Sequence, residues 1–193
     1  MPYSDPPLLS AHDRILLAAH DLFYQHGIRA TGVDGVIAAA GVTKVTFYRH
    51  FPSKNDLVLA FLAYRHETWM AWFRAALSRH ATRQARPLDA LVPALREWMI
   101  SDSYRGCAFI NATAELGETL PEAMTIVRKH KADMTAAIAT LLPPGRGRKA
   151  DAEAIALAVD GTIVHAQMDD RPDAALRVLA RLLQPILVAR PAP

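Results

Sequence analysis

Side chains able to bind a polyanion gather in one short stretch of the sequence. Lysine and arginine offer charged N–H donors to phosphate oxygens, and hydroxyl and imidazole groups offer further donors. Lysine and short side chains can also reach base edges in a major groove. The stretch supplies both kinds: Thr43, Lys44, Val45, Thr46, Tyr48, Arg49, His50 and Lys54. This chemistry points to nucleic acid.

The positions of these residues separate two roles. We expect base contacts from Lys44, Val45 and Thr46, because they occupy the leading end of a short predicted helix. We expect phosphate contacts from the residues that flank this helix, since donors there meet the nucleic-acid backbone: Thr31, Tyr48, His50 and Lys54. Any one of them alone would be an ordinary solvated side chain, so the prediction depends on the group.

A turn must place that helix. Two short helical patterns meet at Ala40-Gly41-Val42, and glycine allows a backbone turn that a Cβ would oppose. This layout predicts a helix-turn-helix at residues 33–50. Phe47 and Phe51 are expected to be core residues that hold the third helix against the first.

The rest of the chain shows the same helical periodicity and no strand alternation, so we predict an all-α protein of about nine helices. Ser10, Thr31 and Ser53 each precede an acid by three positions and are expected to cap helices, as are Thr43 and Thr119. Two domains are predicted: residues 10–56 as a DNA-binding unit and residues 57–190 as a second helical unit.

Composition narrows the class of protein. Hydrophobic residues make up 51% of the 193 positions and the net charge is +3, which suits a folded protein and does not by itself demand nucleic acid. The single cysteine, Cys107, excludes an intramolecular disulfide. We found neither a signal peptide nor a membrane-spanning run, and we expect a cytoplasmic protein. Histidine spacing predicts no metal site.

Residues 15–57 closely resemble the DNA-binding domain of the TetR/AcrR family of repressors. The resemblance is carried by Leu22-Phe23, Gly27, Thr31, Ala40-Gly41-Val42, Tyr48-Arg49-His50-Phe51 and Ser53-Lys54. It implies that residues 57–190 form a ligand-binding and dimerisation domain. It also implies a homodimer that binds a palindromic operator in double-stranded DNA and leaves it when a small-molecule effector binds, with no cofactor and no membrane partner. Val45 departs from the family, which often has a smaller residue there.

The C-terminal helices offer candidate surfaces for those roles. A face of small residues and a leucine stripe predict a dimer interface, although both could pack into the protomer's own core: Ala154, Ala158, Gly161, His165, Leu176, Leu179, Leu183 and Ile186. Candidate effector contacts combine aromatic and polar side chains, for which ordinary core packing is the alternative: Trp69, Trp98, Tyr104, Phe109, Asn111, Glu115, Met134 and His165.

Two other functions compete with a regulator. One is a helical enzyme using Cys107, His165 and Glu115, but the sequence has no phosphate-binding loop, nucleophile motif or metal motif to support it. The other is an architectural DNA-binding protein without an effector site. We therefore expect no enzymatic activity, and we expect Cys107 to be a buried small hydrophobic residue rather than a redox sensor.

Overall fold

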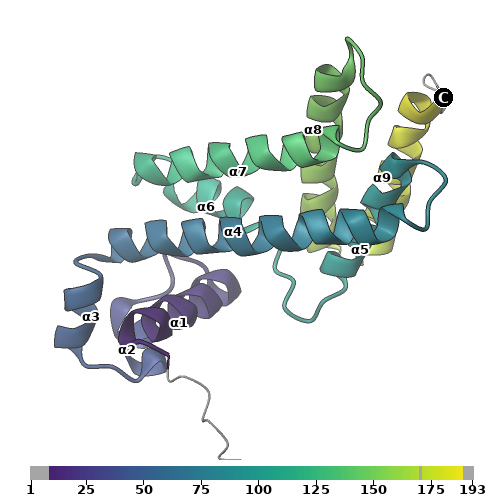
Figure 1. Ribbon diagram of the computed structural model, residues 1–193. Coiled ribbons are helices and arrows are strands. Elements are labelled where there is room, and N and C mark those ends of the chain that lie inside the picture. Colours follow the sequence, from purple (N-terminus) through teal and green to yellow (C-terminus); the bar gives the residue numbers. More distant parts are fainter. Residues whose placement is uncertain (1–8, 170, 189–193) are drawn as a thin grey trace, which may run out of the picture.

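The computed structural model describes residues 9–169 and 171–188. Over these ranges the chain forms nine α-helices, one short 3-10 helix and no strand, which confirms the all-α prediction. The first three helices lie at one end of the long α4, and the other helices lie beside it or at its opposite end (Figure 1). The helices are α1 (Ala11–His26), α2 (Val33–Ala40), α3 (Lys44–His50), α4 (Lys54–Ala81), η1 (Pro87–Ala90), α5 (Leu91–Met99), α6 (Ala108–Leu116), α7 (Pro121–Ala139), α8 (Arg148–Met168) and α9 (Pro172–Val188).

Three of the predicted caps are present. The hydroxyl oxygens of Ser10, Thr43 and Ser53 each accept a hydrogen bond of 3.1 Å from the backbone N–H three residues later. Two predicted caps are wrong. Helix α2 begins after Gly32 and α7 after Leu120, and neither start has a side-chain cap, so Thr31 and Thr119 have other roles.

Helix α4 joins the N-terminal helices to the rest of the protein. Its buried Leu57 and Phe61 face the N-terminal unit, where the Phe61 ring lies 5.4 Å from that of Phe23 on α1. Further along, Trp69 and Phe73 are buried against the C-terminal helices. One continuous core results, and the predicted boundary between residues 56 and 57 falls within the first turn of α4.

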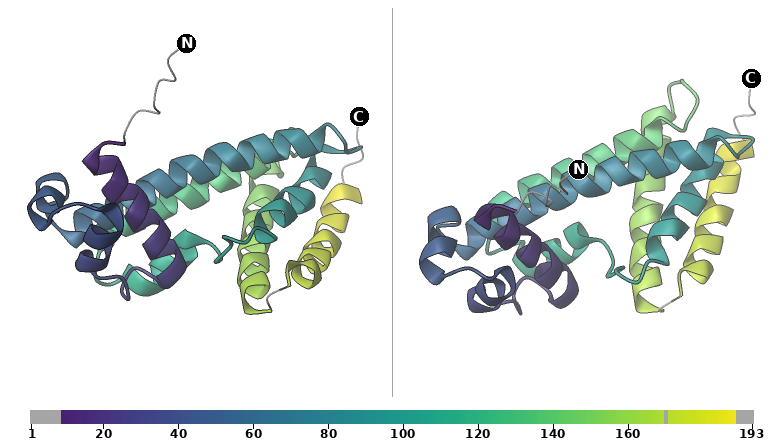
Figure 2. Two further views of the ribbon diagram at one scale, coloured as in Figure 1. Left: turned by 90° about the horizontal axis from the view of Figure 1, so that it is seen from below. Right: turned by 60° about the horizontal axis from the view of Figure 1, so that its bottom comes forward.

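The C-terminal helices form two groups. Helices α4, α6 and α7 pack together, while α8 and α9 stand beside each other at the far end of α4 (Figures 1 and 2). Helix α5 fills the space between α4 and α9. The predicted second domain extends to residue 190, and residues 189–190 lie outside the described part. None of the helices described is both long enough and apolar enough to cross a membrane.

Candidate nucleic-acid interface

The turn between α2 and α3 is held to α1 by one arginine. Arg14 Nη1 donates hydrogen bonds to the backbone oxygens of Ala40, at 2.9 Å, and Gly41, at 3.1 Å. Gly41 has a φ of 61°, a left-handed conformation that favours glycine. The contact spans 26 positions of the sequence, so no local pattern indicated it.

Helix α3 has one buried and one exposed face. Phe47 is fully buried and Phe51 nearly so, which confirms their expected place in the core. The opposite face carries exposed side chains, including Val45 at 70% exposure and Tyr48 at 42%. Lys44, Arg49 and His50 are exposed as well. Four of the predicted donors, Lys44, Tyr48, Arg49 and His50, are therefore exposed on this helix.

The hydroxyl groups of the two threonines in this segment are already engaged at the start of α3. Thr43 Oγ1 accepts from the N–H of Thr46, and the two hydroxyl oxygens lie 2.9 Å apart. Thr46 is also half-buried. Among the three residues expected to contact bases, Lys44 and Val45 are thus the most accessible.

The start of α4 presents a second set of donors. Ser53 Oγ accepts from the N–H of Asp56, while the N–H groups of Lys54 and Asn55 have no partner within the helix. The half-buried Lys54 has its Nζ 6.0 Å from the centre of the Phe23 ring. Because free N–H groups and the helix dipole favour an anion, this end suits a phosphate.

Thr31 has a different environment from the other predicted phosphate contacts. Its side chain is buried, and its hydroxyl donates to the backbone oxygen of Gly27 at 2.7 Å, with that of Leu22 also in range at 3.3 Å. The side chain therefore stabilises the loop after α1. The phosphate contact expected of Thr31 stays a prediction.

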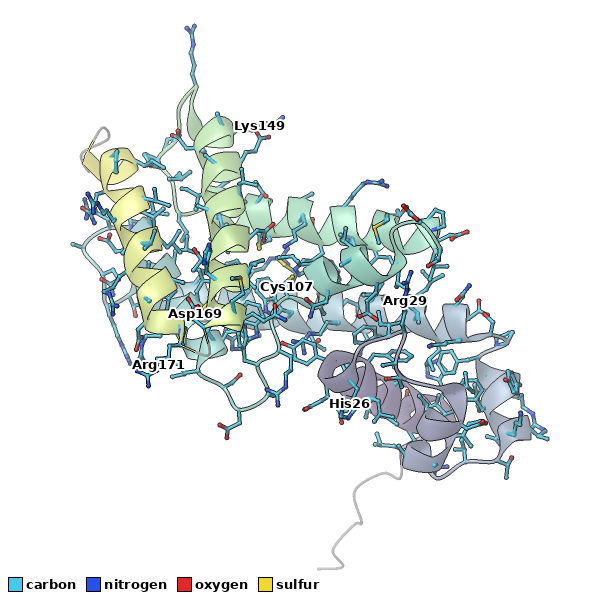
Figure 3. All side chains as sticks on the ribbon, turned by 180° about the vertical axis from the view of Figure 1, so that it is seen from behind. His26, Arg29, Cys107, Lys149, Asp169 and Arg171 are labelled. Atoms are coloured by element: carbon cyan, nitrogen blue, oxygen red, sulfur yellow. The ribbon has the colours of Figure 1, made fainter. Side chains whose placement is uncertain are left out.

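Two side chains, Tyr24 and Glu115, connect the N-terminal helices to the C-terminal ones beyond α4 itself. The buried Tyr24 donates its hydroxyl to the backbone oxygen of Gly106, at 2.8 Å, and accepts from the N–H of Arg105, at 3.0 Å. Glu115 on α6 accepts from the N–H of Arg29, at 2.7 Å. Arg29 lies in the connection between α1 and α2, beside the C-terminal helices (Figure 3). Tyr24 was not singled out from the sequence.

The predicted effector contacts fall into separate regions. Trp69, Trp98, Phe109 and Met134 are buried in the core. There the Phe109 ring stacks on His130, with their centres 3.6 Å apart, and Trp69 Nε1 is buried without a hydrogen-bond partner among the described residues.

Burial, reinforced by the charge of nearby Lys131, lowers the pKa of His130 to about 2, so this imidazole is neutral.

The other four predicted effector contacts lie outside this buried region. The Tyr104 hydroxyl donates to the backbone oxygen of Ile163, and Asn111 Nδ2 donates to that of Arg105. Glu115 lines a cavity of about 190 Å³ between α1 and α6. His165 is exposed on α8. The spacing of these residues in the sequence did not indicate that the predicted effector contacts lie in separate parts of the protein.

The predicted dimer residues divide by exposure. Leu176, Leu179 and Leu183 are buried in the protomer's own core, as the alternative interpretation held, because α9 packs this stripe against α8 and α5. The others are exposed or half-buried: Ala154, Ala158, Gly161, His165 and Ile186. Large apolar side chains missed by the prediction are exposed on the same two helices: Leu157, Val164, Met168, Val178 and Leu182.

The residues of the alternative enzyme do not form one site. Cys107 is buried and receives a contact from Lys131 Nζ at 3.6 Å, while Glu115 binds the Arg29 amide and His165 lines a groove between α8 and α9. Cys107 lies near the middle of the C-terminal helices in Figure 3. Among the described residues, no cluster of three or more potential ligands could hold a metal ion.

Comparison with known proteins identifies the N-terminal region. Residues 15–61 match the family model described as bacterial regulatory proteins, tetR family. The transcriptional activator FasR of Mycolicibacterium smegmatis is 36% identical over 90 residues, which span 47% of this chain and only 41% of FasR.

Longer alignments extend the similarity to the C-terminal helices. The transcriptional regulator AcuR of Cereibacter sphaeroides is 27% identical over 89% of this chain and 83% of its own length. The crystal structure of SCO4454, a TetR-family transcriptional regulator from Streptomyces coelicolor, superposes with a TM-score of 0.77 at 25% identity, covering 93% of this chain and 95% of that one.

Proposed function

We infer that this chain, a member of the TetR family of bacterial regulatory proteins, is a ligand-responsive DNA-binding transcriptional regulator. The observation that carries the inference is the exposed face of α3, which places Lys44, Val45 and Tyr48 on the surface of a helix held by Phe47. A short helix presented in this way can enter a major groove. The proteins to which the chain is similar are regulators by name, not enzymes.

We assign the DNA contacts by exposure. Lys44 and Val45 are proposed to contact base edges, Val45 through an apolar contact such as a thymine methyl group, with Thr46 and Arg49 beside them. Tyr48, His50 and Lys54 are proposed to contact phosphates on either side of the groove. Thr43 orders the helix by capping it.

The surface of α8 and α9 supports a proposed homodimer on a palindromic operator. The groove of about 420 Å³ between them is lined by Gly161, His165, Val178 and Leu182, and exposed Leu157 and Met168 lie nearby on α8. Pairing this surface with a second copy would bury these apolar side chains in a four-helix bundle. Two α3 helices could then contact successive major grooves.

An effector acts by preferring one arrangement of the N-terminal helices over another, since equal affinity for both would shift nothing. We propose that the protein is a repressor and that effector binding among the C-terminal helices reduces its affinity for DNA. Helix α4 and the hydrogen bonds made by Tyr24 and Glu115 are the physical connections that such a change would use.

Footprinting of the DNA beside the protein's own gene tests the proposal. A regulator of this kind protects two adjacent half-sites, and Lys44→Ala changes which bases are preferred while leaving the fold intact. Transcription from the protected promoter then distinguishes a repressor from an activator. Absence of protection at any salt concentration, with the protein folded, would refute DNA binding.

A further inference from the structure

The loop between α5 and α6 places an arginine between two cavities. Arg105 lines both the cavity of about 190 Å³ against α1 and α6 and a second cavity of about 440 Å³ bounded by α8 and Pro172. Gln167 lines both as well. Its side chain passes Gly106 so closely that a Cβ there would lie 2.1 Å from Gln167 Oε1.

The guanidinium of Arg105 is oriented by backbone groups. Its Nη1 donates to the carbonyl oxygens of Asp102, at 3.2 Å, and Tyr104, at 2.7 Å. Nε and Nη2 have no partner among the described residues, and no carboxylate among them pairs with this charge. Among the described residues, one edge of the guanidinium therefore has no partner, which is the geometry that binds a carboxylate through two parallel hydrogen bonds.

We propose that Arg105 binds the carboxylate of a small organic acid, whose apolar part occupies the second cavity. Met99, Tyr104 and Ala166 line this cavity beside the polar Ser101 and Gln167, and none of its described lining residues is acidic. The first cavity contains Glu115, whose charge repels an anion. The proposal rests on the proposed function, because it identifies the class and place of the effector.

The same peptide that carries Arg105 is bonded to the N-terminal helices. Tyr24 on α1 contacts the N–H of Arg105 and the oxygen of Gly106, and Asn111 on α6 donates to the oxygen of Arg105. The Tyr24 ring is covered on one side by Arg65 of α4, 3.9 Å from its centre. A ligand that shifts Arg105 therefore moves the hydrogen-bond partners of α1 directly.

The test begins with binding to the protein alone. Benzoate and hexanoate, measured by calorimetry, are expected to bind the wild type at least about tenfold more tightly than benzamide and hexanamide, because the amides lack the charge. Arg105→Gln is expected to weaken benzoate or hexanoate binding by about tenfold or more and Arg105→Lys by less. Arg83→Gln, at an exposed arginine outside both cavities, is the matched control.

The second step follows the ligand's effect on DNA. Tyr24→Phe keeps the ring against Arg65 but removes both hydrogen bonds, so it should bind the carboxylate normally while DNA affinity ceases to respond to it. DNA binding without carboxylate tests the proposed function separately. Equal binding of acids and amides, or binding unaffected by Arg105→Gln, would overturn this inference even if DNA binding is intact. So would the absence of any binding by either acid up to about 10 mM.

Discussion

The carboxylate of Glu115 on α6 accepts a hydrogen bond of 2.7 Å from the backbone N–H of Arg29, in the connection between α1 and α2. The bond joins the helices proposed to bind DNA to those proposed to bind an effector. It bypasses α4, so the N-terminal unit is held to the rest of the protein at more than one place.

Glu115→Ala should release this connection. Removing the acceptor is expected to lower the free energy of unfolding by about 1 kcal/mol and to speed hydrogen exchange at the Arg29 amide about tenfold. Amide exchange followed by NMR measures the effect at that position. Glu118→Ala, an exposed acid on no described hydrogen bond, is the control, and equal exchange in both variants would contradict the assigned role.

Lys54→Ala should weaken binding to every DNA sequence. Loss of one phosphate contact is expected to reduce the slope of log K against log salt concentration by about 1. Binding titrations over a range of salt concentrations give that slope. Lys149→Ala is the matched control because Lys149 lies at the start of α8, far from the N-terminal helices (Figure 3). An unchanged slope for Lys54→Ala would remove this lysine from the interface.

Two glycines of the helix-turn-helix should respond oppositely to alanine. Gly41→Ala places a Cβ on a residue with a φ of 61° and is expected to destabilise the fold by about 1–2 kcal/mol. Gly35→Ala, in the helical α2 with no atom within 4 Å of the added Cβ, is expected to stabilise it by about 0.5–1 kcal/mol. Urea denaturation compares the two, and a shift of the same sign would contradict the backbone argument.

Acid should destabilise the protein through His130. Its pKa is about 2 when folded, against about 6.5 for an unfolded histidine, so the unfolded state binds more protons between these values. Stability is therefore retained above about pH 6.5 and falls as the pH decreases, by about 2 kcal/mol at about pH 5.

Replacing the imidazole of His130 tests whether this residue causes the loss of stability in acid. His130→Gln should lose less stability than the wild type between about pH 7.5 and about pH 5, whatever its effect at the higher pH. Chemical denaturation at both values measures the difference. His26→Gln, at an exposed histidine near the end of α1, should behave as the wild type. An identical pH dependence for His130→Gln and the wild type would exclude His130 as the cause.

Leu182→Arg should oppose dimer formation. Symmetry places the charge twice in the proposed interface, so the dimer dissociation constant is expected to rise by about two orders of magnitude. Sedimentation velocity measures it, with Ala75→Arg on the exposed face of α4 as the control. A dimer of unchanged affinity would show that this face of α9 is not the interface.

Local chemistry by itself determined the helices and the chemical character of the candidate site. Ser10, Thr43 and Ser53 cap helices because each acts on an N–H only three residues away, and the periodic burial of Phe47 and Phe51 follows from the pattern of one short segment. Gly41 could be assigned to a turn for the same reason.

Tertiary structure decided which surfaces those helices expose and how they are connected. An apolar stripe does not specify what covers it, so Leu176, Leu179 and Leu183 could equally have faced a second copy, yet they pack inward. Arg14 meets Gly41 across 27 positions, and Tyr24 meets Arg105 across 81. Such contacts arise only when the whole core forms, because no periodicity within one helix encodes a partner so distant in sequence.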